Sequence, residues 1–372
     1  LSMLQHGSPW AFALWHSRTR DTTWDVAKRE LVMGDRIFIA IDGFSQLNGY
    51  LDEIEVSHAP DGAVMTISGM DLSGPAMRWH ADPRTVLREQ QLGACLQALF
   101  HPLGIAVDVG VPASTATQIQ TGQRAGATVT TVSRTQRVDI SHPQPGETIW
   151  QVAQRIVQRK GYLMWCAPAI SGGIAVVVDT PNYQGPVRFE FKHKIQNHKA
   201  TGDSNILHGS LRTSIREVPT EVTIYGHSAR GNSRAARIST RIVNAGLTTT
   251  AVTGGVASGF TVSDMLVQPM HIRTNHSRRH GDAERESVRI IAEAMGRIRQ
   301  YTCTVQGHGL PYADASILYA VNTMAHVEDD LAGINEDMLI TDIKFHGSRS
   351  SGQTTSLTLS PKGAIVVVPE TT

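Results

Sequence analysis

Short strand-like segments separated by turn residues run through the chain, and their spacing most constrains how it can fold. Arg36–Ile41 ends at the pair Asp42-Gly43, and Tyr50–Val56 partly alternates apolar with polar residues. Pro60-Asp61-Gly62 then leads into Ala63–Ser68. Asp-Gly pairs favour hairpin turns, and alternation is typical of strands with one buried face. The first ninety residues therefore predict a run of antiparallel strands.

Apolar residues recur at helical spacing in three segments, at 92–100, 149–157 and about 282–299. The second has one apolar stripe with i, i+3, i+4 spacing, which predicts an amphipathic helix. Gly161 follows this helix and is well placed as its C-cap. Tyr162–Cys166 and Ile174–Val178 then predict a hairpin, so helix and hairpin form one compact unit.

Strand patterns return at the end of the chain, in Tyr301–Val305, Asn322–Val327, Asp337–His346 and Thr354–Leu359. The predicted class is α+β and rich in β structure. Two β-rich ends flank a mixed middle, which suggests a duplicated module. We expect four parts: a β domain at 1–90, a helix and hairpin insert at 91–187, a β segment with a long arm at 188–265, and a helix with strands completing a second β domain at 266–372.

Composition excludes several classes of protein. The longest apolar runs of the 372-residue chain are six residues, whereas a membrane helix needs about 20. The net charge of +1 gives no reason to expect nucleic-acid binding. Cys95, Cys166 and Cys303 are too few and too far apart for a disulfide framework or a zinc site. The first residues lack a signal-peptide layout, so we expect free thiols in a reducing compartment.

The residues that could carry chemistry are few. His276 and His280 have the spacing of zinc ligands, but three arginines surround them and disfavour a cation. The acidic groups Glu328-Asp329-Asp330 and Glu336-Asp337 could supply a pair of catalytic carboxyls. They bracket a polar loop, where acids are usually solvated turn residues. We therefore expect no enzyme activity, no metal site and no cofactor.

Two segments without acidic residues, 112–138 and 228–262, have the composition of exposed arms. Aromatic residues for base stacking are nearly absent from both, which disfavours nucleic acid as their partner. Arginine on such arms fits carboxylates of neighbouring subunits. The candidate inter-subunit contacts are Arg124, Arg134, Arg137, Arg230, Arg234, Arg237 and Arg241.

The order of several motifs resembles a known family. Leu31–Gly43 running into Leu47–Asp52, followed by Met65–Ser73, is similar to the opening of baseplate hub proteins of Mu-like contractile-tailed phages, the late control D group. Glu147–Val178 and the ending from Asp337 also fit. The family's Gly-Arg is Gly69-Met70 here, its Asp-Leu-Val-Asp is Gly74-Pro75-Ala76-Met77, and the 228–262 arm is long for the group.

This resemblance implies a structural protein of the virion. Family members form trimeric rings in which each chain supplies two tail-tube-like antiparallel β-barrel domains, here joined by the helix–hairpin insert. Three chains then offer six similar domains, so the ring adapts a six-fold tail tube to a three-fold central spike. The implied partners are two further copies, the tube protein, the spike protein and other baseplate proteins. Genomic DNA would only pass through the channel, no membrane is involved, and assembly would take place in the host cytoplasm before the protein joins the tail baseplate.

Two alternatives remain open. The chain could be a tail-associated peptidoglycan hydrolase or glycan-binding protein, with Glu147, Glu328 and Asp330 as the acids to substitute. It could also be the hub-like part of a type VI secretion spike, which shares this ancestry.

The composition of the 228–262 arm leads to a first prediction. Deleting 230–256 should impair incorporation into the baseplate while leaving the subunit folded, because a contact arm adds nothing to the core. Particle yield and circular dichroism measure the two effects. Normal particles from the deletion would contradict the prediction.

Overall fold

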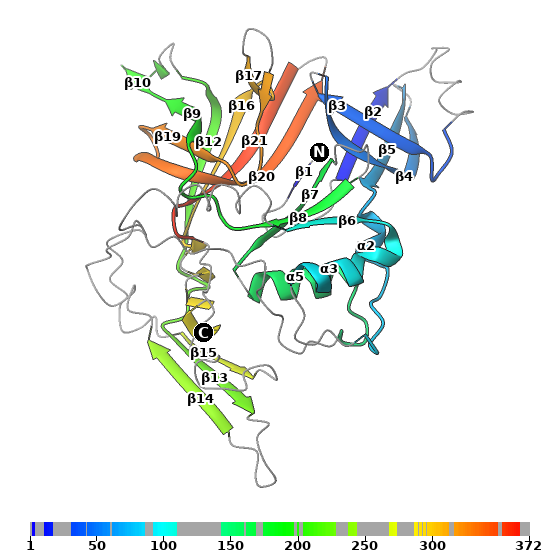
Figure 1. Ribbon diagram of the computed structural model, residues 1–372. Helices are drawn as coiled ribbons and strands as arrows, with labels where there is room; N and C mark the ends of the chain where they lie inside the picture. The colour runs from blue at the N-terminus through cyan, green and yellow to red at the C-terminus, as the bar shows by residue number, and fades with distance from the viewer. Residues whose placement is uncertain are drawn as a thin grey trace, which may run out of the picture.

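The structure is a computed structural model. It describes residues 2–3, 11–17, 31–41, 43–59, 62–85, 92–109, 143–159, 161–168, 174–196, 199–200, 204–227, 237–243, 268–273, 286–311 (without 289, 292 and 295), 316–348 and 352–364. Curled, mostly antiparallel sheets dominate these residues, and short helices cover one side of the middle part (Figure 1). The predicted β-rich α+β class is confirmed.

Four strands near the start form what we call the N-terminal strand group. They are β2 (Ala11–Ser17), β3 (Arg36–Ile41), β4 (Phe44–Ala59) and β5 (Gly62–Asp71). Their spatial order is β2-β5-β4-β3, with every pair antiparallel. The predicted strands at 36–41, 50–56 and 63–68 all lie inside these elements.

Four strands near the end form the C-terminal strand group. They are β16 (Arg299–Gln306), β19 (Met324–Asp329), β20 (Ile334–Ser348) and β21 (Gly352–Pro361). Their order is β16-β21-β20-β19, again antiparallel throughout. The strands predicted for this part of the chain are confirmed in position.

The two groups correspond strand by strand. In chain order the N-terminal strands have 7, 6, 16 and 10 residues, and the C-terminal strands have 8, 6, 15 and 10. In both groups the register of the long hairpin shifts by one residue at the same place. Asp52 is the extra residue in β4, next to the pair Leu51–Gly69, and Thr341 is the extra residue in β20, next to the pair Ile340–Leu359. Gly69 and Leu359 each come seven residues after the first residue of their strand.

One eleven-stranded sheet contains both groups. The two-residue strand β1 (Ser2–Met3) pairs with β2 on one side and β20 on the other. β12 (Ile206–Thr213) pairs with β16, and β9 (Val187–His193) runs parallel to β19. Two small hairpins accompany the sheet: β10 (Ile195–Gln196) with β11 (Lys199–Ala200), and β17 (Gly309–Pro311) with β18 (Ser316–Leu318).

The insert is a layer of helices against a three-stranded sheet (Figure 1). Its helices are α2 (Gly74–Arg78), α3 (Leu92–Phe100), the 3-10 turn η1 (His101–Leu103) and α5 (Ile149–Arg159). Its strands, in the order β6-β8-β7, are β6 (Ala106–Val109), β8 (Ile174–Asp179) and β7 (Leu163–Pro168). Gly161 has a φ of 75°, which suits the predicted C-cap.

A separate three-stranded sheet projects below the rest of the molecule in Figure 1. It consists of β13 (Glu221–His227) between β14 (Arg237–Val243) and β15 (Pro269–Arg273). Val222 and Ile224 on β13 pack against Ile290 and Ile291. The described residues between 286 and 296 are helical, so the predicted helix ends earlier than expected because Arg299 already pairs within the large sheet.

One apolar cluster runs through the insert and both strand groups, from Leu47 and Trp150 to Tyr301 and Leu359. Phe100 and Trp150 meet edge to face inside the insert, with ring centroids 6.0 Å apart. None of the helices in the described ranges has the length and apolarity needed to cross a bilayer.

Buried Asn322 ties the exit of the insert to the C-terminal strand group. Its Oδ1 accepts a hydrogen bond from the Asn182 amide at 2.8 Å, and its Nδ2 donates to the Thr180 carbonyl at 2.9 Å. Its own amide donates to Ile340 at 2.9 Å, and its φ is 63°, in the left-handed region. Asparagine tolerates this conformation better than most residues.

We expect Asn322→Ala to lower the free energy of unfolding by about 2–4 kcal/mol, because it removes two buried hydrogen bonds and strains the left-handed backbone. Asn322→Gly loses the same bonds without the strain, so it should recover about 1 kcal/mol of the loss. Urea denaturation measures both variants. Equal stability of the alanine variant and the wild type would show that this linkage does not hold the fold together.

Candidate interaction site and its polar anchor

The tight connection between β19 and β20 is organised by the carboxylate of Asp329. Its Oδ1 accepts backbone hydrogen bonds from Leu331 at 2.9 Å and Ala332 at 3.1 Å, which fix the turn. Its Oδ2 accepts the Tyr301 hydroxyl at 2.6 Å. Asp329 is only 4% exposed. The sequence-based interpretation of these acids as solvated turn residues is therefore wrong for Asp329, because β12 and β16 pack over it.

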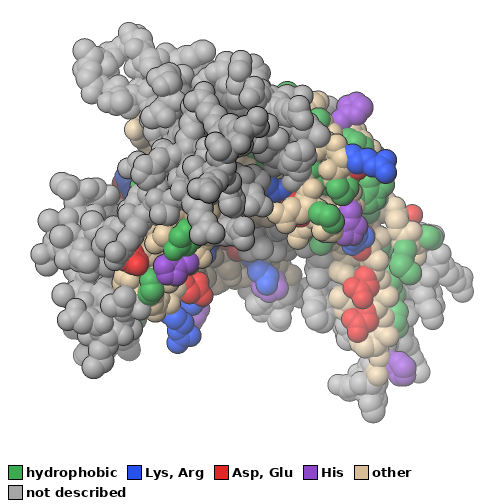
Figure 2. Space-filling view, turned by 90° about the horizontal axis from the view of Figure 1, so that it is seen from below, with side chains coloured by type: hydrophobic (Ala, Val, Ile, Leu, Met, Phe, Trp, Pro, Cys, Tyr) green, Lys and Arg blue, Asp and Glu red, His purple; other side chains and the backbone are tan. Residues whose placement is uncertain are grey.

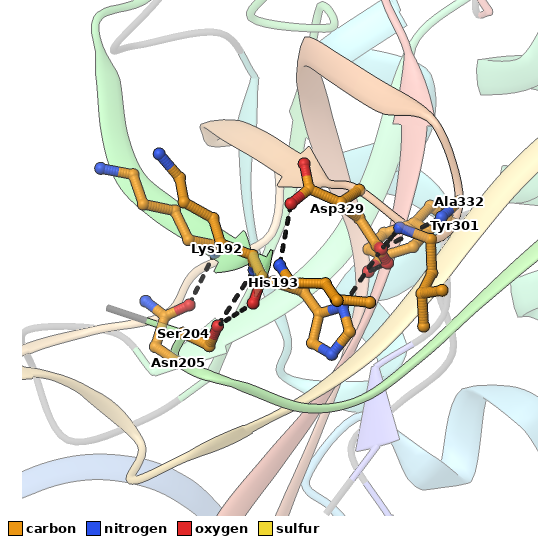
Figure 3. A network of polar contacts seen from close by, with 11 residues as sticks. Lys192, His193, Ser204, Asn205, Tyr301, Asp329 and Ala332 are labelled. Carbon is orange, nitrogen blue, oxygen red and sulfur yellow. Dashed lines mark hydrogen bonds and ion pairs between the residues drawn. The ribbon is translucent and has the colours of Figure 1, made fainter. Parts of the chain in front are cut away.

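Glycine at position 209 allows this packing. A Cβ there would lie 2.6 Å from the Tyr301 hydroxyl and 2.9 Å from Oδ2 of Asp329, closer than real contacts permit. The middle of β12 can therefore lie directly against the Tyr301–Asp329 pair. Figure 3 shows the resulting network, in which His193 approaches the same carboxylate with Nδ1 3.4 Å from Oδ1.

A second set of hydrogen bonds holds the start of β12 against β9. The Lys192 amide donates to Oδ1 of Asn205 at 2.7 Å, and Nδ2 of Asn205 donates to the Glu190 carbonyl, also at 2.7 Å. The Lys194 amide donates to the Ser204 hydroxyl at 3.0 Å. These contacts lie beside the Asp329 network (Figure 3). Together they set the position of β12 at this end of the sheet.

The electrostatics of the network favour a fixed charge over proton transfer. Burial alone would raise the pKa of Asp329, but hydrogen bonds from Tyr301, Ala332 and Leu331 and the nearby His193 outweigh it and lower that pKa. Burial and the bond to Asp329 raise the pKa of Tyr301 far above its usual range. At neutral pH the carboxylate stays ionised and the phenol stays protonated. The pair therefore acts as a structural anchor.

The three acids of the hydrolase alternative are each engaged in local structure. Glu147 forms a two-bond ion pair with Arg155, at 3.0 and 2.8 Å. Glu328 pairs with Lys194 at 3.2 Å. Oδ2 of Asp330 accepts the Ile195 amide at 2.9 Å. These contacts stabilise a helix start and the strand ends around β19.

The three cysteines are free and buried, as the sequence predicted. Burial raises the pKa of Cys95. The Cys166 thiol lies 2.9 Å from the Ser73 hydroxyl, and burial together with the Asp71 charge raises its pKa well above its usual value. Burial raises the pKa of Cys303 to about 12. A neutral thiol is a poor nucleophile and a poor metal ligand, so these side chains serve the core.

The described residues contain no group of three or more metal-ligating side chains. His276 and His280 lie outside the described residues, as do five of the seven arginines predicted to contact other subunits: Arg124, Arg134, Arg137, Arg230 and Arg234. Arg237 and Arg241 lie in β14, opposite His227 and Thr223 of β13. The segment predicted as an irregular arm thus contains a strand. Deleting 230–256 would remove that strand, so a deletion of 244–256 tests the arm more cleanly.

Exposed apolar side chains mark two parts of the large sheet. Val32, Met33, Phe38 and Val56 belong to the region of β3 and β4, and Val187, Leu207 and Leu331 to that of β9, β12 and β19. These two regions lie on opposite sides of the upper part of the molecule in Figure 1. In the described part of the face shown in Figure 2, basic and acidic side chains form small separate groups without a patch of one sign. Such a surface suits protein contacts better than nucleic acid.

The strands at the two ends of the sheet's pairing order are β3 and β12. Seven of the eight residues of β12 are at least partly exposed. Among the described strands β12 pairs only with β16, although Asn205 just before it bonds to the Lys192 carbonyl of β9. Strand β12 was not predicted from the sequence, because its exposed residues give no alternation of apolar and polar positions. Unpaired backbone groups at the edge of such a strand can bond to a strand of another chain.

No known family model and no curated protein matches this sequence. Solved structures do match. The chain is similar to the tail protein from Neisseria meningitidis MC58, with a TM-score of 0.71 and 18% identity over 99% of this chain and 92% of that one. It is also similar to the 43 kDa tail protein of prophage MuSo2 from Shewanella oneidensis, with a TM-score of 0.70 and 17% identity over 98% and 94%.

A third similar structure is the E. coli c3393 protein, a component of the type VI secretion system, with a TM-score of 0.52 and 9% identity over 99% of this chain and 75% of that one. At these identities the likeness concerns the fold. The chain has the fold of phage tail proteins.

The Asp329 anchor predicts a pH-dependent stability. Asp329→Asn should lower the free energy of unfolding at pH 7 by about 2–3 kcal/mol, because the ionised acceptor is replaced by an amide. A lowered pKa stabilises the fold above the unfolded value of about 4, and this contribution is lost as the pH falls through the folded value. The difference between variant and wild type should therefore shrink below about pH 4.

Thermal unfolding at neutral and acidic pH measures this effect. Asp330→Asn is the matched control, since its exposed carboxylate accepts one backbone bond that an amide oxygen can replace. A wild-type advantage over Asp329→Asn that stays constant with pH would exclude the charge as its source.

Proposed function

We propose that this chain is a structural baseplate hub protein of a contractile phage tail. Three copies form a ring that adapts the six-fold tail tube to the three-fold central spike. Its partners are the tube protein, the spike protein and other baseplate proteins, and genomic DNA passes through the ring only as cargo. The protein assembles in the host cytoplasm, ends in the virion tail and performs no catalysis.

The correspondence of the two strand groups is the observation that carries this proposal. They share strand order and the position of the bulge in the long hairpin, and corresponding strands differ in length by one residue at most. A chain with two equivalent β units presents six such units in a trimer, which is the number that a six-fold tube requires. The two strand groups need no sequence identity to act as equivalent units, because equivalent backbone surfaces can make the same contacts.

The comparisons support a tail protein over its alternatives. Both tail proteins align over more than nine tenths of each chain, with TM-scores of 0.71 and 0.70. The secretion-system protein aligns less well, at 0.52. The hydrolase alternative has no supporting observation in the described residues, where its three acids hold local structure.

The arginines of the two arms remain part of the proposal as contacts to neighbouring subunits. Arg237 and Arg241 are on β14, at one edge of the small projecting sheet. This sheet extends away from the main body in Figure 1, as a contact element between subunits would. The other five arginines are proposed for the same role from composition alone.

The mass of the purified protein tests the ring. We expect native mass spectrometry to give three times the mass of one chain, because the open sheet edges of single subunits cover one another. Electron microscopy of the same sample should show a ring with three-fold symmetry and six similar lobes. A monomer, both alone and with the spike protein of the same phage, would exclude the proposed hub.

A further inference from the structure

The contact between the two strand groups inside one chain lies at a defined place on β20. β20 pairs with β21 along one edge, while its other edge is shared by β19 in the first half and β1 in the second. Met3 is opposite Ile343 and Ser2 is opposite Lys344. β1 therefore covers the edge of the C-terminal group and leads directly into the N-terminal group through β2.

In the described residues, no strand covers the equivalent edge of β4. The bulges make Asp52 equivalent to Thr341, so Ile54 and Glu55 take the places of Ile343 and Lys344. β3 pairs with β4 up to Tyr50, and Gly34 and Asp35 just before β3 make backbone hydrogen bonds to Leu51. Beyond it, no strand in the described ranges pairs with this edge of β4, and Glu55 and Val56 are exposed there.

The equivalent of β1 is β12. β1 pairs with β2, the first strand of the N-terminal group, and β12 pairs with β16, the first strand of the C-terminal group. Phe12 is paired with Gly69 and Tyr301 with Leu359, the two residues that pair next to the bulges of β4 and β20. The residues before them, Ala11 and Gln300, are therefore equivalent. Ser2 is opposite Ala11 and Arg212 is opposite Gln300, so Arg212 takes the place of Ser2.

We infer that β12 of one copy pairs antiparallel with the open edge of β4 of the next copy, repeating the contact between β1 and β20. Transferring the register places Arg212 opposite Glu55, Thr213 opposite Ile54 and Leu211 opposite Val56. The inference rests on the proposed ring and specifies its subunit contact. Contacts within and between chains then alternate around the ring, and both are the same kind of strand pairing.

The residues that this register places opposite one another are complementary in charge and in apolar surface. Arg212 and Glu55 have opposite charge, and both are exposed in the single subunit. Val56 is 46% exposed and would be covered by the half-buried Leu211. Directly opposite charges stabilise a strand pair and like charges destabilise it. The Asp329 network supports this contact, because the Tyr301–Asp329 pair packs against Gly209 and fixes the position of β12.

Charge reversal tests the pairing. Glu55→Arg and Arg212→Glu should each raise the dissociation constant of the ring by about tenfold, because each places like charges opposite one another at every interface between copies. The double variant should recover most of the affinity. Glu217→Arg is the matched control, an exposed acid outside the contact whose reversal should leave assembly unchanged. Thermal unfolding confirms that each variant is folded.

Disulfide cross-linking tests the register. Val56→Cys combined with Leu211→Cys should give covalent dimers and trimers on mild oxidation, since opposite residues in antiparallel strands have Cβ atoms about 5 Å apart. Val56→Cys with Leu207→Cys is the control, shifted by four residues and about 13 Å along the strand. The three native cysteines are buried and contribute little background.

The outcomes separate this inference from the proposed function. Cross-links from the 56/211 pair but not the 56/207 pair, with rescue by the double charge reversal, would support both. A trimer that gives neither the 56/211 cross-link nor the rescue would overturn the pairing and leave the hub intact. A chain that remains monomeric would overturn the ring itself.

Discussion

The pairing of exposed strand edges is the constraint on which the rest of this structure depends. Unpaired backbone groups at a sheet edge attract any available strand, and a protein must cover them or use them. In the described residues, β1 links the two strand groups, because Ser2 pairs with Ala11 of β2 on one side and with Lys344 of β20 on the other. In the described residues, parts of the edges of β4 and β12 have no strand beside them.

Hydrogen bonds of buried polar side chains position β12 and the strands of the C-terminal strand group. Asp329 fixes the turn after β19, and together with Tyr301 it packs against Gly209 of β12. Asn322 fastens the exit of the insert to Ile340 in the middle of β20. Each group has its hydrogen-bond partners, so its burial specifies one arrangement of the strands at little cost. These side chains therefore position the strands of the sheet.

Elements with strong local patterns could be predicted from the sequence. The apolar stripe of α5, the hairpin of β7 and β8, and the turn signals around β3, β4 and β5 gave the right structure at nearly the right residues. β12, β14 and β15 gave no such signal. Among the eight residues of β12 only Ile206 is buried, so its strand conformation comes from pairing with β16. The role of Asp329 was missed for a related reason, since Glu328, Asp329 and Asp330 look alike in sequence.

The sequence alone determined that this is a β-rich chain with a helical insert, free buried thiols and few candidates for catalysis. It did so because periodicity, turn chemistry and composition are local properties. Tertiary structure alone decided that the two ends form one sheet, that both strand groups have a bulge at the same place, and which of three adjacent acids is buried. These features depend on strands far apart in the chain, and no local pattern records which strand will lie beside which.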